Sequence, residues 1–296
     1  MGAIYRREMS SFFTSGLGYV FLTVFYAFSG YFFFNQVIES GISDTSPMFE
    51  SMFIMFIFLI PVLTMRLISE EKKNRTDQGL LTAPISLWEL VLGKYLAAFT
   101  LFVIAESIIF VYAVIIRYLG DVVWSTLLGN YFAMLILGGA FIAIGLFVSS
   151  LTENQMTSAV ASFVVMLLLY YFDENLMEKV QNNEIRILLW IVFLLAVIYG
   201  VYRITSIFTS SFRMTIVISG MIALILLTVF EAFLADAFMN IETDKIQRFV
   251  SELSFRSRYV EFTKGVFNAT SILFFISTAF LFNFFTVKVI EKRRWS

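Results

Sequence analysis

The sequence contains neither cysteine nor histidine. Without cysteine the chain can form no disulfide bond, thiol nucleophile or thiolate metal site, and without histidine it lacks the usual general base near neutral pH. Charge is also scarce, since 15% of the 296 residues are charged and the net charge of −1 provides no positive field for nucleic acid. An enzyme with this composition would have to work with carboxylates, hydroxyls, lysine and arginine.

Motifs for nucleotide binding and hydrolysis are missing as well. The P-loop pattern G-x-x-x-x-G-K-[ST] does not occur, because Gly93-Lys94 is followed by Tyr95 and no strand is expected before it. The sequence has no G-x-S-x-G elbow, and H-E-x-x-H is impossible without histidine. We therefore expect no catalytic residue, no metal site and no ATP site in this chain.

Apolar residues dominate the composition. Hydrophobic residues make up 59% of the chain and the mean hydropathy is +0.84, which is typical of an integral membrane protein. Because a bilayer core needs about 20 mostly apolar residues per helix, the sequence predicts an all-α polytopic membrane protein with about eight transmembrane helices. The candidate spans are Leu17–Gln36, Ser51–Ile68, Tyr95–Ile116, Leu128–Val148, Thr157–Phe172, Ile187–Tyr202, Met214–Ala235 and Ala269–Val287. Six spans are the alternative, if the sixth and seventh candidates form a re-entrant hairpin.

Lysine and arginine in the loops orient these spans, because cytoplasmic loops carry an excess of both. With the N-terminus inside, the short outer loops hold only Arg117, Lys179 and Arg186, and in the longer outer segment near residues 236–268 acidic residues offset the basic ones. The inner segments hold a larger group, namely Arg6, Arg7, Arg66, Lys72, Lys73, Arg75, Lys94, Arg203, Arg213, Lys288, Lys292, Arg293 and Arg294. Both termini and the charged stretch Arg66–Lys94 are therefore predicted to be cytoplasmic.

Two segments outside the spans have helical patterns of their own. In residues 1–14, Tyr5, Met9 and Phe12 share one face, which predicts an amphipathic helix along the inner interface. This helix would be either a membrane anchor or a docking element for a partner. In Thr243–Phe267, two apolar stripes predict short outer helices that dip into the outer leaflet, with a solvated loop on the outer rim as the alternative.

The charged stretch Arg66–Lys94 contains a predicted stiff turn. Pro84 should end any helix before it, and the sequence SLWE at residues 86–89 is a capping box that starts the helix of the third span. Leu80 and Leu81 stay exposed unless a partner covers them. A charged loop is most often a solvated face, but two leucines flanked by charges on a stiff turn favour a docking surface.

Two acidic residues lie inside predicted spans. Glu106 falls near the middle of the third span and Glu231 lies nearer the outer end of the seventh, where a charged group is costly. Each is a candidate pathway residue for a substrate or a proton, with a carboxyl bonded to a neighbouring serine or threonine as the structural alternative. Pro61 in the second span predicts a kink, and Gly138-Gly139 in the fourth predicts a close helix contact.

The order of these segments resembles the permease subunit of a type-2 ATP-binding-cassette (ABC) exporter, in the gliding-motility-permease branch of Gram-positive bacteria. The resemblance covers nearly the whole chain. It is carried by YRRE at residues 5–8, GYVFLTVFYAFSGYFF from Gly18, RLISEEKKNRTDQGLLTAPIS from Arg66, GAFIAIGLFVSSLTENQ from Gly139, SFRSRYVEFTKGVFN from Ser254 and EKRRW from Glu291. The usual member has six spans, so residues 187–235 are interpreted as an inserted helix pair to which no family role can be transferred.

The resemblance implies a single permease domain, residues 1–296, in a bacterial plasma membrane. Two permeases, identical or related, would sit in membrane lipid above two cytosolic ATPase subunits, and these would bind ATP and magnesium while this chain holds no cofactor. A coupling segment within residues 69–86 and the helix at 1–14 would contact the ATPase, and 243–267 would close the exit. The implied interface residues are Glu70, Glu71, Lys72, Arg75, Asp77, Gln78, Leu80, Leu81, Pro84, Tyr5, Arg6 and Arg7.

Other functions remain open at this point. A secondary transporter would be expected to have inverted repeats and ionisable groups at the midplane of the membrane, where only Glu106 is found. A mechanical or signalling subunit could use the motion of an ATPase without moving substrate, and would keep the same coupling segment. An intramembrane enzyme lacks a workable catalytic set.

Overall fold

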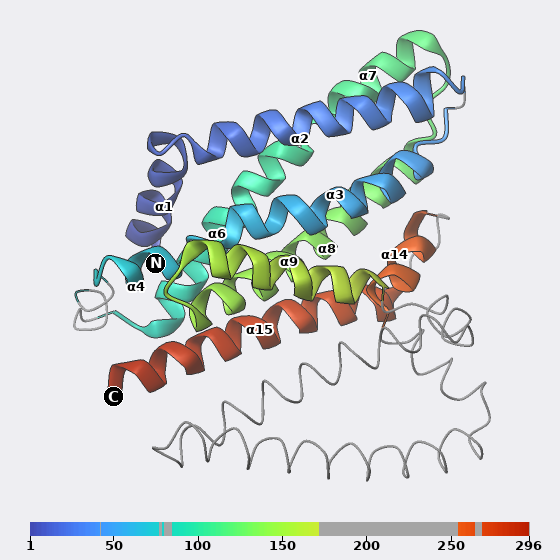
Figure 1. Cartoon of the computed structure of the whole chain (residues 1–296). Coiled ribbons are helices and arrows are strands. Elements are labelled where there is room, and N and C mark those ends of the chain that lie inside the picture. Colours follow the sequence, from blue (N-terminus) through green and yellow to red (C-terminus); the bar gives the residue numbers. More distant parts are fainter. Residues whose placement is uncertain (42, 77–78, 80–84, 172–253, 264–267, 296) are drawn as a thin grey trace, which may run out of the picture. The chain divides into compact units, whose positions relative to one another are not determined.

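The computed structural model describes residues 1–41, 43–76, 79, 85–171, 254–263 and 268–295. Within these residues every regular element is a helix, which confirms the predicted all-α fold class (Figure 1). The elements are α1 (Gly2–Thr14), α2 (Leu17–Phe33), the π-helical turn η1 (Phe34–Ile38), α3 (Ser46–Thr64), α4 (Ser69–Lys73), α6 (Leu87–Glu106), α7 (Ile108–Leu119), α8 (Trp124–Leu151), α9 (Gln155–Tyr171), α14 (Phe255–Thr263) and α15 (Ala269–Trp295). They belong to one compact unit, whereas a second unit, Phe172–Ser254, falls almost wholly outside the described residues.

Five helical stretches in the described part of the chain are long and apolar enough to cross a membrane. They are Leu17–Ile38, Ser46–Lys73, Leu87–Leu119, Trp124–Leu151 and Ala269–Arg293, and a shorter apolar helix covers Gln155–Tyr170. These six helices lie at six of the eight predicted places. The other two candidates, Ile187–Tyr202 and Met214–Ala235, lie outside the described residues.

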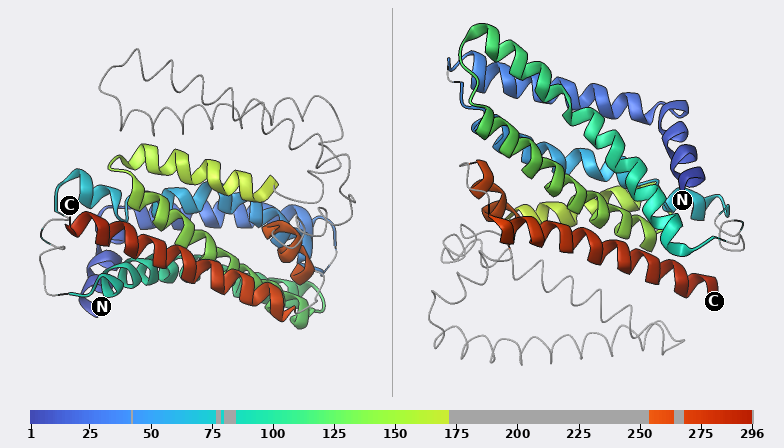
Figure 2. Two further views of the ribbon diagram at one scale, coloured as in Figure 1. Left: turned by 90° about the horizontal axis from the view of Figure 1, so that it is seen from below. Right: turned by 180° about the vertical axis from the view of Figure 1, so that it is seen from behind.

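The helices run alternately up and down the bundle. Figures 1 and 2 show both termini and α4 at one end, and α7 and α14 at the opposite end. The end that holds the termini also contains most of the cationic residues of the described chain, in α1, around α4 and at the end of α15. By the excess of positive charge in inner loops, this end is cytoplasmic.

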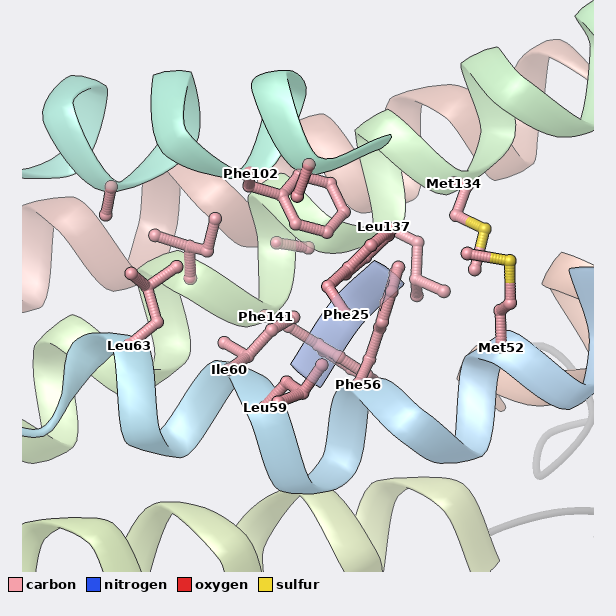
Figure 3. Close-up of a cluster of buried hydrophobic side chains, with 14 of the residues drawn as sticks. Phe25, Met52, Phe56, Leu59, Ile60, Leu63, Phe102, Met134, Leu137 and Phe141 are labelled. Atoms are coloured by element: carbon pink, nitrogen blue, oxygen red, sulfur yellow. The ribbon is translucent and has the colours of Figure 1, made fainter. Parts of the chain in front are cut away.

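The interior of the bundle is built around α3 and α8, whose apolar windows are the most deeply buried of the long helices. Figure 3 shows this core, in which Phe56 of α3, Phe102 of α6 and Phe141 of α8 point into the same space. The rings of Phe56 and Phe102 meet edge to face, with centroids 5.0 Å apart. Exposed apolar side chains concentrate on α2, α7, α9 and α15, as a lipid-facing surface requires.

Glycines let α8 approach its neighbours closely. A Cβ at Gly138 would overlap the ring of Phe102, and a Cβ at Gly145 would lie 2.9 Å from Thr64 Cβ on α3. The close helix contact predicted at Gly138-Gly139 is therefore present, because Gly139 also packs against Phe99 and Tyr95 of α6.

The helix of the third span starts where the sequence predicts, at Leu87, and Ser86 and Glu89 form the predicted capping box with a Glu89 N to Ser86 Oγ distance of 3.1 Å. It differs from the prediction in being interrupted at Ser107, whose Oγ donates to the Ile104 carbonyl 2.6 Å away. A serine that bonds back to the preceding turn bends a helix, so α6 and α7 form two segments rather than one.

The outer part of the described chain contains one of the predicted interfacial helices. In α14, Tyr259 and Phe262 are buried, and the Tyr259 hydroxyl donates to the Phe49 carbonyl of α3 at 3.0 Å. This packing favours a helix held against the bundle rather than a solvated loop. The first predicted stripe, before Ser254, lies outside the described residues.

Candidate functional site

At the cytoplasmic end, four charged side chains from three helices form a closed ring. Arg7 and Glu8 come from α1, Glu71 from α4 and Lys94 from α6. Lys94 Nζ lies 3.0 Å from Glu8 Oε1 and 2.9 Å from Glu71 Oε1. Arg7 Nη2 lies 2.8 Å from Glu8 Oε1 and also forms an ion pair with Glu71. Each cation therefore contacts both carboxylates, and the ring has no net charge.

The packing of α1 on α6 places the ring. The apolar face of α1 covers the start of α6, with Ile4 buried against Gly93 and the Tyr5 hydroxyl donating to Thr100 Oγ1 at 3.2 Å. At Gly93 a Cβ would lie 3.0 Å from Ile4, so the glycine permits the approach. Lys94 follows directly and is thereby directed between α1 and α4.

The turn between α3 and α4 is fixed by several further polar contacts. Lys94 Nζ donates to the Leu67 carbonyl at 2.6 Å, and Lys72 Nζ donates to the carbonyl of Ser150 on α8. Ser149 Oγ accepts hydrogen bonds from the backbone amides of residues 68 and 69, each at 3.2 Å. The first turn of the charged loop is therefore tied to α6 and α8.

A pocket of about 290 Å³ opens beside the ring. It is lined by both charge signs, since Arg66 and Glu70 join the ring members at its wall. The full lining is Arg7, Glu8, Ser11, Arg66, Leu67, Glu70, Glu71, Asn74, Thr76 and Lys94. Within the described part of the chain no group of three or more acidic side chains is placed to hold a metal ion. The wall of the pocket thus offers charged and polar groups of both signs.

The electrostatics of the ring favour the charged forms of Glu8 and Arg7. Burial alone would raise the pKa of the Glu8 carboxyl, but the charge of Lys94 and hydrogen bonds from Arg7 and Lys94 outweigh it, so this pKa is lowered. Burial would likewise lower the pKa of the Arg7 guanidinium, but Glu8 and Glu71 raise it. The two ring members that come from α1 are therefore charged at neutral pH.

The lowered pKa of Glu8 predicts a stability profile in acid. A carboxyl whose pKa is lower in the folded state contributes stability above its ordinary pKa of 4.5, and loses this contribution as the pH falls through the lowered value. We expect wild type to be more stable than Glu8→Gln by a constant margin between about pH 5 and pH 7, and the margin to shrink below 4.5. Thermal unfolding in detergent across this range measures it. A margin that grows in acid would contradict the assignment.

The structure describes seven of the predicted interface residues. Arg7 and Glu71 meet in the ring, and Tyr5 packs on α6. Lys72 is buried and its ammonium group donates to the Ser150 carbonyl of α8, and its predicted contact with an ATPase stays a prediction. The remaining described residues, at the surface or partly exposed, are Arg6, Glu70 and Arg75. Those outside the described residues are Asp77, Gln78, Leu80, Leu81 and Pro84.

Sequence reasoning missed Glu8, Arg66 and Lys94. Arg66 Nη2 donates to the Ser11 carbonyl at 3.0 Å and its guanidinium stacks over Phe12, which adds a second tie to α1. Lys94 looked like an ordinary loop charge because it precedes the third predicted span. The available signal was its position two turns inside the helix that starts after Ser86, where a lysine needs a carboxylate partner.

The two acidic residues assigned to the spans have different outcomes. Glu106 is fully buried at the interruption between α6 and α7, and neither of its carboxyl oxygens has a hydrogen-bond partner among the described residues. The serine or threonine partner of the structural alternative is therefore not found there. Glu231 lies outside the described residues.

Membrane-length helices, a cytoplasmic amphipathic helix and a charged first inner loop define a multi-pass membrane protein with a polar contact surface at one end. A family model described as ABC-2 family transporter protein matches residues 3–186, more than half of the chain. The chain belongs to this family and is a permease-type membrane subunit. A search of curated proteins finds no match.

Proposed function

We propose that this chain is the membrane-spanning subunit of an ABC exporter in a bacterial plasma membrane. A separate cytosolic ATPase would bind ATP and magnesium, and a second permease, identical or related, would complete the pathway. The observation that carries the proposal is the cytoplasmic surface around α4. Lys73 and Arg75 are exposed there, next to the ring and its pocket, and the family supplies the expectation of an ATPase partner.

The backbone at Arg75 supports a shaped contact surface. Its φ of 56° is in the left-handed region, which turns the chain sharply after α4, and the Thr76 amide bonds the Glu71 carbonyl at 3.0 Å. The backbone as far as Thr76 therefore continues a segment that is tied to α6 and α8. Movement of an ATPase bound here would be transmitted into the membrane helices, and substrate would leave between two permeases.

Arg75→Glu tests the docking surface. We expect about tenfold weaker recovery of the ABC ATPase encoded with this permease when the tagged permease is purified, because a reversed charge at an electrostatically matched interface is repulsive. Arg117→Glu is the matched control, since Arg117 is an exposed arginine of α7 at the opposite end of the bundle. Leu81→Asp should weaken recovery in the same way. Absence of any co-purifying ATPase with wild type would contradict the proposed function, and equal recovery for both arginine variants would contradict the surface.

A further inference from the structure

The charge ring joins elements that are far apart in the sequence. Arg7 and Glu8 lie about sixty residues before Glu71, which itself precedes Lys94 by more than twenty. Two contacts at each corner close the ring, so no single side chain can leave without breaking two ion pairs. Such closure distinguishes the ring from an isolated surface ion pair, which contributes about 0–1 kcal/mol.

One side of the ring is dry and the other is open to water. The Lys94 side chain is 1% exposed, those of Glu8 and Glu71 are 13% and 15% exposed, and Arg7 is 49% exposed. Because water screens the Arg7 side, the dry Lys94 corner is where the two carboxylates are held most strongly. Without Lys94, two largely buried carboxylates would face each other with only Arg7 between them.

Lys94 also contacts the backbone of the α3–α4 turn. Besides its hydrogen bond to Glu8 and its ion pair with Glu71, the ammonium group donates to the Leu67 carbonyl at 2.6 Å. The one side chain therefore holds α1 through Glu8, α4 through Glu71 and the turn through Leu67, from a rigid position inside α6.

We propose that Lys94 is a positioning residue that joins α1, α4 and the base of α6 into one rigid unit at the cytoplasmic end. Displacement of the loop after α4 then moves the N-terminal helix and the third span together. That an ATPase causes this displacement rests on the proposed function, whereas the role of Lys94 in joining α1, α4 and α6 does not.

Paired spin labels test the joint without any ATPase. The chain lacks native cysteine, so Ser10→Cys on α1 and Asn74→Cys at the C-terminal cap of α4, both exposed positions, can be labelled specifically. We expect a narrow distance distribution in otherwise wild-type protein in lipid nanodiscs, and a broad one when Lys94→Met is added. An equally narrow distribution with Lys94→Met would overturn the proposal.

A second variant covers the case in which Lys94→Met does not fold. Arg7→Gln removes the exposed corner only, and it should broaden the same distribution to a smaller extent. Lys288→Met, at an exposed lysine of α15 paired with Glu291, should leave the distribution unchanged. If Lys94→Met yields no folded protein, a distribution in Arg7→Gln as narrow as that of wild type overturns the proposal.

The final measurement adds the ATPase and a trapped ATP state. In wild type the distance between the two labels should stay the same on trapping, since both helices move as one unit, whereas in Lys94→Met it should shift. A shift of the same size in the label-to-label distance of wild type would contradict the proposed role of Lys94. If no ATPase binds wild type, the proposed function fails. The distance distributions measured without the ATPase still test whether Lys94 joins α1, α4 and α6.

Discussion

Replacing Lys94 with methionine should lower the free energy of unfolding by about 3–5 kcal/mol, the usual cost of removing one partner from a buried ion pair. Methionine fills a similar volume and therefore leaves little cavity. The loss arises because Glu8 and Glu71, which are largely buried, keep their charges but lose the ammonium group between them. The Leu67 carbonyl loses its donor as well. Unfolding of the purified protein in detergent, followed by helical circular dichroism, measures the change.

Lys288→Met is the matched control for this substitution. Lys288 is 55% exposed and pairs with Glu291 at 2.7 Å on the surface of α15, so its replacement should cost about 0–1 kcal/mol. Equal losses for the two variants would show that the ring is no stronger than a surface pair. A triple variant with Lys94→Met, Glu8→Gln and Glu71→Gln should recover part of the lost stability, because no uncompensated carboxylate remains.

Gly145→Ala should destabilise the bundle by about 1–3 kcal/mol, the range for overpacking a well-packed core. The added methyl group would lie 2.9 Å from Cβ and 3.0 Å from Cγ2 of Thr64. Thr64 is fully buried, is branched at Cβ and bonds the Ile60 carbonyl at 2.9 Å, so it cannot turn away and α3 or α8 must shift. The same shift would disturb Ser149, one turn further along α8, and its bonds to the α3–α4 turn.

Gly30→Ala provides the comparison on another helix. Its nearest neighbour would be the Tyr112 hydroxyl at 3.6 Å, an ordinary contact, so the substitution should be neutral or stabilise the protein by about 0.5–1 kcal/mol through lower chain entropy. Thermal unfolding of both variants under identical detergent conditions distinguishes a steric effect at Gly145 from a general effect of replacing a helical glycine with alanine. A stabilised Gly145→Ala protein would show that α3 and α8 are less closely packed than described.

Much of the fold can be predicted from the periodicity and length of the apolar runs in the sequence. Apolar runs of about twenty residues located the five membrane-length helices, and the SLWE motif located the start of α6, because these signals are local. The interruption at Ser107 was not predicted, since a serine inside an apolar run bends a helix only when its hydroxyl bonds back to the preceding turn. That choice depends on the surrounding packing.

The candidate site was harder to predict from the sequence than the fold was. The charged stretch around Glu71 was found from its composition, but its partners Glu8 and Lys94 lie in other helices, and no local pattern records which helices meet. Lys72 is the opposite case, a residue whose local sequence suggests exposure although its side chain is buried. It lies in the charged sequence SEEKKNR, yet its side chain is buried against the end of α8.

The neutrality of the ring separates two tasks that charge performs at the cytoplasmic end. Because its two cations and two anions cancel, the ring contributes little to the electric field beyond about one Debye length, ~8 Å at physiological salt. An approaching protein would be attracted mainly by the exposed cations Arg6, Lys73 and Arg75. Under the proposed function, capture of the ATPase and transmission of its motion would therefore use different charges, and a substitution could change the affinity for a partner without loosening the connection to the membrane helices.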